Sequence, residues 1–373
     1  MNRRKKILFV FGTRPEAIKL APVIRAIDGE KDHFVSRICV TAQHREMLDQ
    51  VLRLFRIRVH HDLNIMQKGQ SLEHLTSRIL LGVKAVVKQE QPDVMIIQGD
   101  TTTTFAASLA AFYEHVPVAH VEAGLRTWDH RHPYPEEMNR VLTTDLASLH
   151  FAPTREARRN LLKEGVPSAK ISVTGNTVVD ALLHIRKGIA GKSFERTFAG
   201  IDFSKRIILV TGHRRESFGE GFRNICRAIR TIAREENVEV VYPVHLNPNV
   251  QKPVREILSG ISNVHLLEPL HYEPFVSLMD RSYLILTDSG GVQEEAPSLG
   301  KPVLVMRQRT ERPEGVKAGT VRLVGTNKDG IVREVRRLLQ DPKAYLKMSR
   351  AHNPYGDGKA GVRIVRALKK HFA

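Results

Sequence analysis

The chain has 373 residues, with 58 Lys or Arg against 40 Asp or Glu, so its formal net charge is +18. This length suggests two domains, and the charge favours an anionic ligand, which could be nucleic acid, an acidic membrane surface or a small substrate. The basic residues are spread along helical segments without a long Lys/Arg tail. A nucleic-acid binder, which would bind with steep salt dependence, is therefore a minor alternative, and we expect neither nucleic acid nor a membrane as partner.

The two cysteines and the lack of a long apolar segment give information about the cellular compartment. Cys39 and Cys226 lack CxxC spacing, which argues against a disulfide framework and a structural zinc site. No stretch approaches the roughly 20 apolar residues that a membrane-spanning helix needs. These features fit a protein of the reducing cytoplasm.

Short apolar runs bounded by Gly, Thr, Asp or Pro alternate with segments of helical period. Continuous apolar strands separated by helices are typical of parallel sheets covered on both faces. In the first half they predict strands over residues 7–11, 36–40, 94–98, 117–121 and 149–152. In the second half they predict strands over residues 207–210, 238–244, 264–266, 283–286, 302–306 and 321–324. The fold class is therefore α/β, with two Rossmann-like, doubly wound domains in tandem.

The boundary between the domains is expected near residues 171–180. The N-terminal domain then covers residues 1–174, and a C-terminal Rossmann-like domain covers residues 175–358. A last helix over about residues 359–373 is expected to pack back on the first domain.

Ligands of such sheets bind beyond the carboxyl ends of the strands, so the residues after each strand matter most. Thr13 and Glu16 have capping-box spacing after the first strand, and Pro15 suits the first turn of a helix. Arg14 at that helix start, or Lys19, could hold a diphosphate. A plain surface position for Arg14 stays open.

Three carboxylates follow later strands or open a helix in the first half. Asp100 stands after the strand at residues 94–98, where a plain helix N-cap is the alternative. Glu122 closes a buried strand and must find a partner or a cleft. Glu136 lies in the first turn of a helix, where Glu often only complements the helix dipole. Together the three suit proton transfer, provided that their neighbours set their pKa values apart.

The segment 287–295 follows a buried strand and reads TDSGGVQEE. Ser289, Gly290 and Gly291 would present backbone N–H groups at a helix N-terminus, which is a seat for phosphate. Glu294 and Glu295 follow one turn in and could bind a ribose. The segment predicts a nucleotide site, although a Gly-rich connection in an ordinary α/β protein is the alternative.

Further polar groups of the second half also follow strands. His213 could hydrogen-bond a phosphate or move a proton, and His245 follows the next strand, although a lone His is more often structural. Arg307, Arg309 and Arg312 add positive charge near the Ser-Gly-Gly segment.

Three motifs that would indicate other cofactors are incomplete. The segment 219–224 lacks the third Gly of a dinucleotide fingerprint, and the segment 191–193 has Arg186 where a Walker motif requires Gly. His130 and His132 are a weak zinc signal. NAD, ATP hydrolysis and a metal site therefore receive little support.

Taken together, eight ordered motifs resemble the non-hydrolysing UDP-N-acetylglucosamine 2-epimerases of bacteria, from about residue 7 to 365. They are FGTRPEAIK (11–19), TAQHREMLDQ (41–50), QGDTTT (98–103), HVEAGLRT (120–127), YPEEMNR (134–140), TGHRRESFG (211–219), PVHLNPNV (243–250) and the segment 287–312. The resemblance implies a glycosyltransferase-B fold with its active site in the interdomain cleft, and usually a homodimer. It also implies interconversion of UDP-GlcNAc and UDP-ManNAc without an added cofactor, supplying ManNAc for cell-surface polysaccharide.

The resemblance also implies roles for individual residues. Asp100, Glu122 and Glu136 would be the acid/base residues, with His213 assisting at the diphosphate. The UDP contacts would be Arg14, His213, Phe275, Ser289, Gly290, Gly291, Glu295 and Arg312, with Lys19 supporting them. A second, activating UDP-GlcNAc could bind near Gln43, Arg214 and His245, although Gly69 stands where some members carry Arg.

The chemistry explains why such a site needs these groups. The C2 hydrogen has no adjacent carbonyl and is barely acidic, so departure of UDP from C1 must accompany its removal. A 2-acetamidoglucal forms, and UDP adds back with C2 protonated on the other face. A retaining glycosyltransferase, a hydrolysing epimerase and an epimerase of a UDP-uronic acid or diacetamido sugar are the alternatives.

Overall fold

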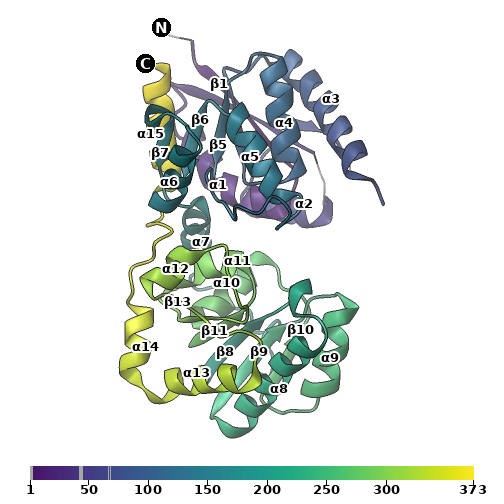
Figure 1. Ribbon diagram of the computed structural model, residues 1–373, viewed down its shortest axis with the longest axis vertical. Coiled ribbons are helices and arrows are strands. Elements are labelled where there is room, and N and C mark those ends of the chain that lie inside the picture. The colour runs from purple at the N-terminus through teal and green to yellow at the C-terminus, as the bar shows by residue number, and fades with distance from the viewer. Residues whose placement is uncertain (1–2, 42–44, 66, 68) are drawn as a thin grey trace. The chain divides into compact units, whose positions relative to one another are not determined.

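The computed structural model describes residues 3–41, 45–65, 67 and 69–373. The chain divides into two compact units (Figure 1). Unit 1 is Met1–Ala181 with Gly356–Ala373, and unit 2 is Leu182–Tyr355. The first crossing point falls inside helix α7 (Thr177–Gly188), and the chain returns to unit 1 just before its last helix. Within the described residues, no helix is both long and apolar enough to cross a membrane.

Unit 1 contains a seven-stranded parallel sheet in the order β3-β2-β1-β4-β5-β6-β7. Its strands are β1 (Lys5–Phe11), β2 (Phe34–Val40), β3 (His61–Asp62), β4 (Val94–Gln98), β5 (Val118–Val121), β6 (Leu149–Ala152) and β7 (Ile171–Val173). Its helices are α1 (Arg14–Asp28), α2 (Arg45–Leu54), α3 (Leu72–Glu90), α4 (Thr102–Tyr113), α5 (Glu136–Leu146), α6 (Arg155–Lys163), the 3-10 turn η1 (Ser168–Lys170) and α15 (Ala360–Phe372). The central strands are buried on both faces, as in β1, where residues 7–11 are fully buried. This explains their unbroken apolar sequence.

Unit 2 contains a six-stranded parallel sheet in the order β10-β9-β8-β11-β12-β13. Its strands are β8 (Arg206–Thr211), β9 (Val238–Pro243), β10 (Val264–Leu267), β11 (Leu284–Thr287), β12 (Val303–Val305) and β13 (Val321–Leu323). Its helices are α8 (Glu220–Glu235), α9 (Pro248–Leu258), α10 (Tyr272–Arg281), α11 (Gly290–Glu295), α12 (Pro313–Ala318), α13 (Lys328–Gln340) and α14 (Pro342–Ser349), with 3-10 turns η2 (Arg215–Ser217) and η3 (Ala296–Leu299). Both sheets have the doubly wound strand order of Rossmann folds.

All eleven predicted strands are present, and two further strands of unit 1 were not predicted. Strand β3 is two residues long and pairs only with the end of β2, so it is too short to show an apolar pattern. Strand β7 lies at residues 171–173, where the sequence predicts the domain boundary; it pairs with β6 along the edge of the sheet. The prediction of two doubly wound α/β domains is confirmed.

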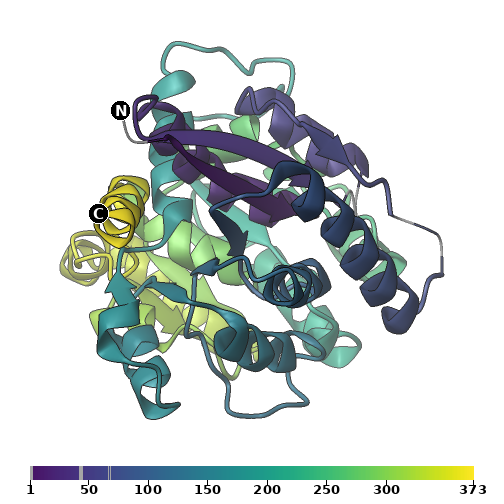
Figure 2. The ribbon, with the colours of Figure 1, turned by 90° about the horizontal axis from the view of Figure 1, so that it is seen from above.

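Helix α15 returns to unit 1 and packs on α1. Asp180 of α7 accepts hydrogen bonds from the first two amides of α15, Ala360 N at 3.2 Å and Gly361 N at 2.9 Å. At the far end Phe372 lies against the start of the sheet, with its ring centroid 5.3 Å from Lys5 Nζ. Figures 1 and 2 show α15 (yellow) beside the start of β1 (purple).

The contact between α15 and α1 requires glycine at position 361. A Cβ atom there would lie 2.9 Å from the carbonyl oxygen of Pro22, which is backbone and cannot rotate away. The two helices therefore approach more closely than any other residue would permit.

A buried histidine lies under the carboxyl end of the first sheet. His120 of β5 is 1% exposed, and its Nε2 lies 2.7 Å from the carbonyl oxygen of Gly99. A carbonyl can only accept, so Nε2 carries the proton in the neutral ring. Burial lowers the pKa of His120 to about 3, with the Gly99 hydrogen bond opposing this shift. His120 therefore holds the turn before Asp100 as a neutral donor.

We expect Gly361→Ala to lower the free energy of unfolding by about 1–3 kcal/mol, the usual cost of forcing a methyl group into a packed contact. Gly188→Ala is the matched control, because a Cβ at this helical position meets nothing within 4 Å. Urea unfolding of both variants checks this. Equal stability of the two would contradict the packing argument.

Replacing His120 should make the free energy of unfolding depend less on pH below pH 7. The folded pKa lies below the ordinary value of 6.5, so the unfolded chain binds more protons between pH 6.5 and about 3, and stability falls as pH falls through that window. Between pH 7 and pH 5 the wild type should lose about 2 kcal/mol more than His120→Gln. Urea unfolding at both pH values measures this difference, and parallel losses in the two proteins would refute it.

Candidate functional site

Several site candidates of each unit follow the strands at which the strand order of the sheet reverses. In unit 1, β2 and β4 lie on either side of β1; in unit 2, β9 and β11 lie on either side of β8. Ligands of doubly wound sheets bind outside the carboxyl ends of the strands at this point. The loops after β1 and β4 carry Arg14 and Asp100, and those after β8 and β11 carry His213 and Ser289.

Glu16 ties together the two loops of unit 1. Its Oε2 accepts from the backbone nitrogens of Gly12 at 3.0 Å and Thr13 at 2.7 Å. Its Oε1 accepts from the hydroxyl of Thr101, after β4, at 2.8 Å. Burial raises the pKa of Glu16, with these hydrogen bonds opposing the shift. The predicted capping box is confirmed, and Arg14 is the half-buried first residue of α1.

Glu122 is held in an unusual backbone conformation at the end of β5. Its φ is 68°, a left-handed value that costs a residue other than glycine about 1–3 kcal/mol. Its Oε2 lies 2.5 Å from Lys19 Nζ and accepts from Gln98 Nε2 at 2.7 Å. The buried carboxylate therefore has a cation and an amide beside it, as a strand-end Glu requires.

The turn after Glu122 depends on Gly124. Its φ is 90°, and a Cβ there would lie 2.3 Å from the carbonyl oxygen of Ala157 in α6. No other residue fits this place, so α6 and Gly124 together fix the direction in which the chain leaves β5.

Asp100 is paired with an arginine from α5. Its Oδ2 accepts from Arg140 Nε at 2.9 Å and Nη2 at 2.6 Å. Arg140 Nη1 also donates to the fully buried Glu137 at 2.7 Å. Burial alone would lower the pKa of Arg140, but the Asp100 and Glu137 carboxylates outweigh it and raise that pKa. Glu136, the neighbouring first residue of α5, is half-buried.

Asp288 organises the two central loops of unit 2. It is fully buried after β11, and its Oδ2 accepts from the backbone nitrogens of His213 at 2.7 Å and Arg214 at 2.8 Å, after β8. The His213 ring stacks on that of His245, with centroids 5.3 Å apart. Burial lowers the pKa of His213, while the charge of Asp288 opposes this shift.

The Ser-Gly-Gly segment opens helix α11 as predicted, with Ser289 at the N-cap and Gly290 first in the helix. A Cβ on Gly290 would lie 2.8 Å from Cζ of Arg312, so this guanidinium lies directly against the first turn. Arg312 Nε donates to Glu294 at 2.9 Å. A Cβ on Gly291 would meet nothing closer than 3.9 Å, so there is free space on that side of the residue.

Glu295 ends α11 and is 6% exposed. Its Oε1 accepts from the hydroxyl of Tyr272 at 2.5 Å. Tyr272 and Phe275 both lie in the first turn of α10, and Phe275 is half-buried. The first turn of α10 is thus tied to α11.

The structure therefore joins several predicted residues through contacts within each unit. Lys19 contacts Glu122 in unit 1, and Gly290 with Arg312 and His213 with His245 are in contact in unit 2. Gln43 lies outside the described residues. Sequence analysis did not identify the partners Gln98, Arg140 and Asp288, although all three lie within the motifs at the strand ends.

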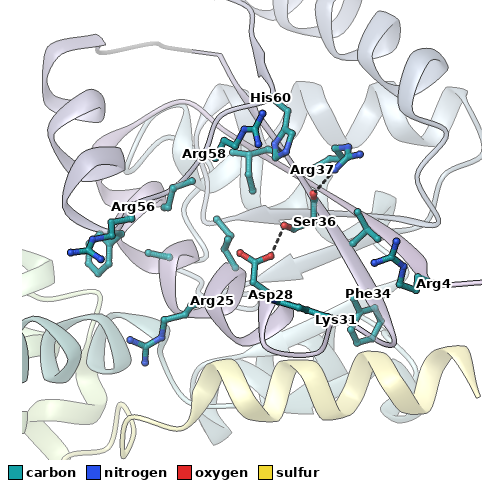
Figure 3. Close-up of a pocket in the computed structure, with 16 residues that line it drawn as sticks. Arg4, Arg25, Asp28, Lys31, Phe34, Ser36, Arg37, Arg56, Arg58 and His60 are labelled. Atoms are coloured by element: carbon teal, nitrogen blue, oxygen red, sulfur yellow. Dashed lines mark hydrogen bonds between the residues drawn. The ribbon is translucent and has the colours of Figure 1, made fainter.

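Unit 1 also contains a cavity of about 520 Å³ that does not belong to these loops. It lies over the amino-terminal half of β2, between α1 and residues 55–60. Figure 3 shows its cations, among them Arg25 and Arg58, pointing in different directions around Asp28, which accepts from Ser36 at 2.5 Å. The cations do not converge on one point, so the cavity is a poor seat for an anion. Among the residues described, no three His, Cys, Asp or Glu are grouped to hold a metal ion.

Comparison with known proteins identifies the family. A profile described as UDP-N-acetylglucosamine 2-epimerase matches residues 25–369. A UDP-N-acetylglucosamine 2-epimerase of Yersinia pestis is 60% identical over 372 residues, which cover 98% of this chain and 99% of the relative.

Solved structures agree with this relationship. The crystal structure of a Neisseria meningitidis UDP-GlcNAc 2-epimerase bound to UDP-GlcNAc is 52% identical, covers 98% of this chain and 100% of its own, and superposes with a TM-score of 0.92. A glycotransferase of kitacinnamycin shares the fold alone, at 13% identity over 99% of each chain and a TM-score of 0.65. The predicted glycosyltransferase-B architecture of two parallel-sheet α/β domains is thus confirmed at the level of the fold. With Glu122, Asp100 and the Ser-Gly-Gly helix start placed at the strand ends of such a fold, the chain belongs to the UDP-N-acetylglucosamine 2-epimerase family.

Proposed function

We propose that this protein is a non-hydrolysing UDP-GlcNAc 2-epimerase that interconverts UDP-GlcNAc and UDP-ManNAc and so supplies ManNAc units for cell-surface polysaccharide. The observation that carries the proposal is the strand-end carboxylate Glu122, held at a φ of 68° between Lys19 and Gln98. Strained backbone conformations persist where the surroundings enforce them, and they cluster at active sites. The family relationship supplies the substrate.

The reaction begins with cleavage of the anomeric C–O bond. UDP leaves with the bonding electron pair, and the positive character at C1 acidifies the C2 hydrogen. A carboxylate takes that proton, and the C2–H electrons form the double bond of 2-acetamidoglucal. Re-addition of UDP at C1, with a proton delivered to the other face of C2, gives the epimer. Both fragments must stay bound throughout, because water would otherwise release the free sugar.

The proton transfers are assigned to unit 1. Asp100, Glu122 and Glu136 are the acid/base residues of the proposal, and Arg140 and Lys19 give the first two different electrostatic surroundings. Different surroundings are what separate the pKa values of an acid and a base. Three carboxylates around the sugar are hard to explain in a retaining glycosyltransferase, which would also need a pocket for its acceptor.

UDP binding is assigned mainly to unit 2. Ser289, Gly290 and Gly291 would present backbone N–H groups to the diphosphate, with Arg312 beside them. Glu295 would bind the ribose, and Phe275 lies in the helix turn tied to it. His213 would assist at the departing diphosphate, and Arg14 of unit 1 completes the set of proposed contacts.

An activating second UDP-GlcNAc is a separate part of the proposal. Arg214 and His245 would contact it. Arg214 follows His213 in the chain, and the His245 ring stacks on the His213 ring. Gln43 is the third residue of this proposed site.

The setting is the cytoplasm. Cys39 and Cys226 are buried free thiols, and burial raises the pKa of each to about 12, so both stay as unreactive thiols. A chain that uses its cysteines as core residues suits a reducing compartment.

We further propose a homodimer formed through α3 and α4 of unit 1. Leu81, Phe112 and Tyr113 are 65%, 56% and 59% exposed. An ion pair of 3.9 Å joins Lys84, three residues after Leu81 in α3, to Glu114, which follows Tyr113 at the end of α4. Large exposed apolar side chains grouped on one face mark an interaction surface.

Incubation with UDP-GlcNAc alone in D2O, followed by proton NMR, tests the activity. We expect UDP-ManNAc to appear with deuterium at C2 and without accumulating free ManNAc. Asp100→Asn and Glu122→Gln should each lower turnover by about 100-fold or more, since general acid/base catalysis contributes that much, while UDP binding persists. Glu156→Gln, which removes a surface ion pair with Arg159, should stay active.

No exchange and no new sugar with the wild type would overturn the UDP-GlcNAc assignment and direct attention to UDP-sugars with a C6 carboxylate or a second acetamido group. Accumulating ManNAc would instead indicate hydrolysis.

Leu81→Lys should shift the protein from dimer to monomer in analytical ultracentrifugation, because a charge would have to be buried in the interface. Leu346→Lys in α14 is the matched control, since Leu346 is also exposed but belongs to unit 2. An unchanged dimer in the Leu81 variant would place the interface elsewhere.

A further inference from the structure

Three arginines of unit 2 meet at one carboxylate, Glu311. Its Oε1 lies 3.2 Å from Arg214 Nη2 and 2.8 Å from Arg312 Nη1. Its Oε2 accepts from Arg307 Nη1 at 2.7 Å. Arg214 follows β8, whereas Arg307 and Arg312 belong to the segment after β12. A single side chain therefore joins the loop after one strand to the segment after another.

Glu311 remains ionised throughout the physiological pH range. Its side chain is 17% exposed, and burial alone would raise its pKa. The charges of Arg312, Arg307 and Arg214 outweigh burial and lower the pKa to about 2. Three charge-assisted contacts on one carboxylate make this the central charge of the group.

The position of Arg312 depends on this charge. Its guanidinium lies against the first turn of α11, where a Cβ on Gly290 would come within 2.8 Å of it. The positive end of a helix repels a cation, so a guanidinium needs nearby carboxylates to rest there. Glu294 binds Nε at 2.9 Å and Glu311 binds Nη1 at 2.8 Å. Loss of Glu311 would remove one of these two carboxylates.

We infer that Glu311 is a positioning residue that holds Arg312 in place for the diphosphate of UDP and keeps the neighbouring Arg214 from repelling it. The inference rests on the proposed function, which assigns Arg312 to UDP. In this proposal Glu311 acts through Arg312 and has no contact with the sugar or the reacting bonds. It directs two guanidinium groups from two segments and prevents their mutual repulsion before the ligand arrives, which is the benefit of preorganisation.

A purely structural role predicts a different outcome. An ion-pair group that only stabilised unit 2 would change the melting temperature and leave UDP affinity unaltered. A carboxylate that competed with the diphosphate for the arginines would weaken UDP binding in the wild type, and its removal would tighten it. Affinity therefore separates the three roles.

The test is the dissociation constant for UDP of Glu311→Gln, measured by isothermal titration calorimetry on the full chain. Loss of one charge-assisted contact should raise this constant about tenfold. KM for UDP-GlcNAc should rise in parallel, with kcat within about threefold of wild type, because no interaction specific to the transition state is removed. Glu311→Asp keeps the charge, so its UDP dissociation constant should lie between those of the wild type and Glu311→Gln, about threefold above wild type.

Glu334→Gln is the matched control. Glu334 of α13 is also mostly buried, and it binds Arg322 at 3.1 Å and Arg337 at 2.9 Å away from the strand-end loops. Its loss should lower stability and leave the UDP dissociation constant unchanged. Glu216→Gln removes the other carboxylate partner of Arg307. Its UDP dissociation constant therefore shows how much the position of Arg307 contributes to UDP binding.

An unchanged or tighter UDP dissociation constant for Glu311→Gln overturns the inference, even if its melting temperature falls. If circular dichroism shows that this variant does not fold, Glu311→Asp decides in the same way. A wild type that binds UDP and epimerises, beside a Glu311 variant of equal affinity, would refute this inference alone. A wild type that binds no UDP would refute the proposed function together with it.

Discussion

Buried carboxylates that accept backbone N–H groups organise the central loops of both units. Glu16 binds the amides of Gly12 and Thr13 after the first strand of unit 1, and Asp288 binds those of His213 and Arg214 after the first strand of unit 2. In both cases two successive amides at the end of the central strand share one carboxylate oxygen. An unpaired buried amide is costly, so these loops hold one conformation before any ligand binds.

The element that supplies the carboxylate differs between the units, and so does the way in which it connects the loops. Glu16 comes from the helix that follows its own loop, and it reaches across to Thr101 after β4. Asp288 comes from the neighbouring strand, so the loops after β8 and β11 are joined directly. The amides of both central loops are then occupied by protein carboxylates. The start of α11 differs from both, because a Cβ on Gly291 would meet nothing closer than 3.9 Å.

Sequence patterns predicted the sheets and most strand-end residues, because both depend on local order along the chain. The six apolar runs of unit 2 are long enough to be recognised, and their ends place His213 and Ser289 correctly. The two-residue β3 shows no such pattern. The partners of the site residues depend on which strands become neighbours. Arg140, for example, reaches Asp100 across 40 positions of the chain. Apolar periodicity carries no information about that pairing.

The position of Asp288 also favours one nitrogen of His213 as the site of its proton. Asp288 Oδ1 is buried without a hydrogen bond of its own and lies 3.4 Å from His213 Nδ1. The field of this carboxylate favours the Nδ1–H tautomer, so in the neutral ring the lone pair lies on Nε2. Neutral His213 then accepts a hydrogen bond on the side facing away from Asp288, and only its protonated form can donate there. A diphosphate oxygen on that side would therefore select the imidazolium and bind together with a proton.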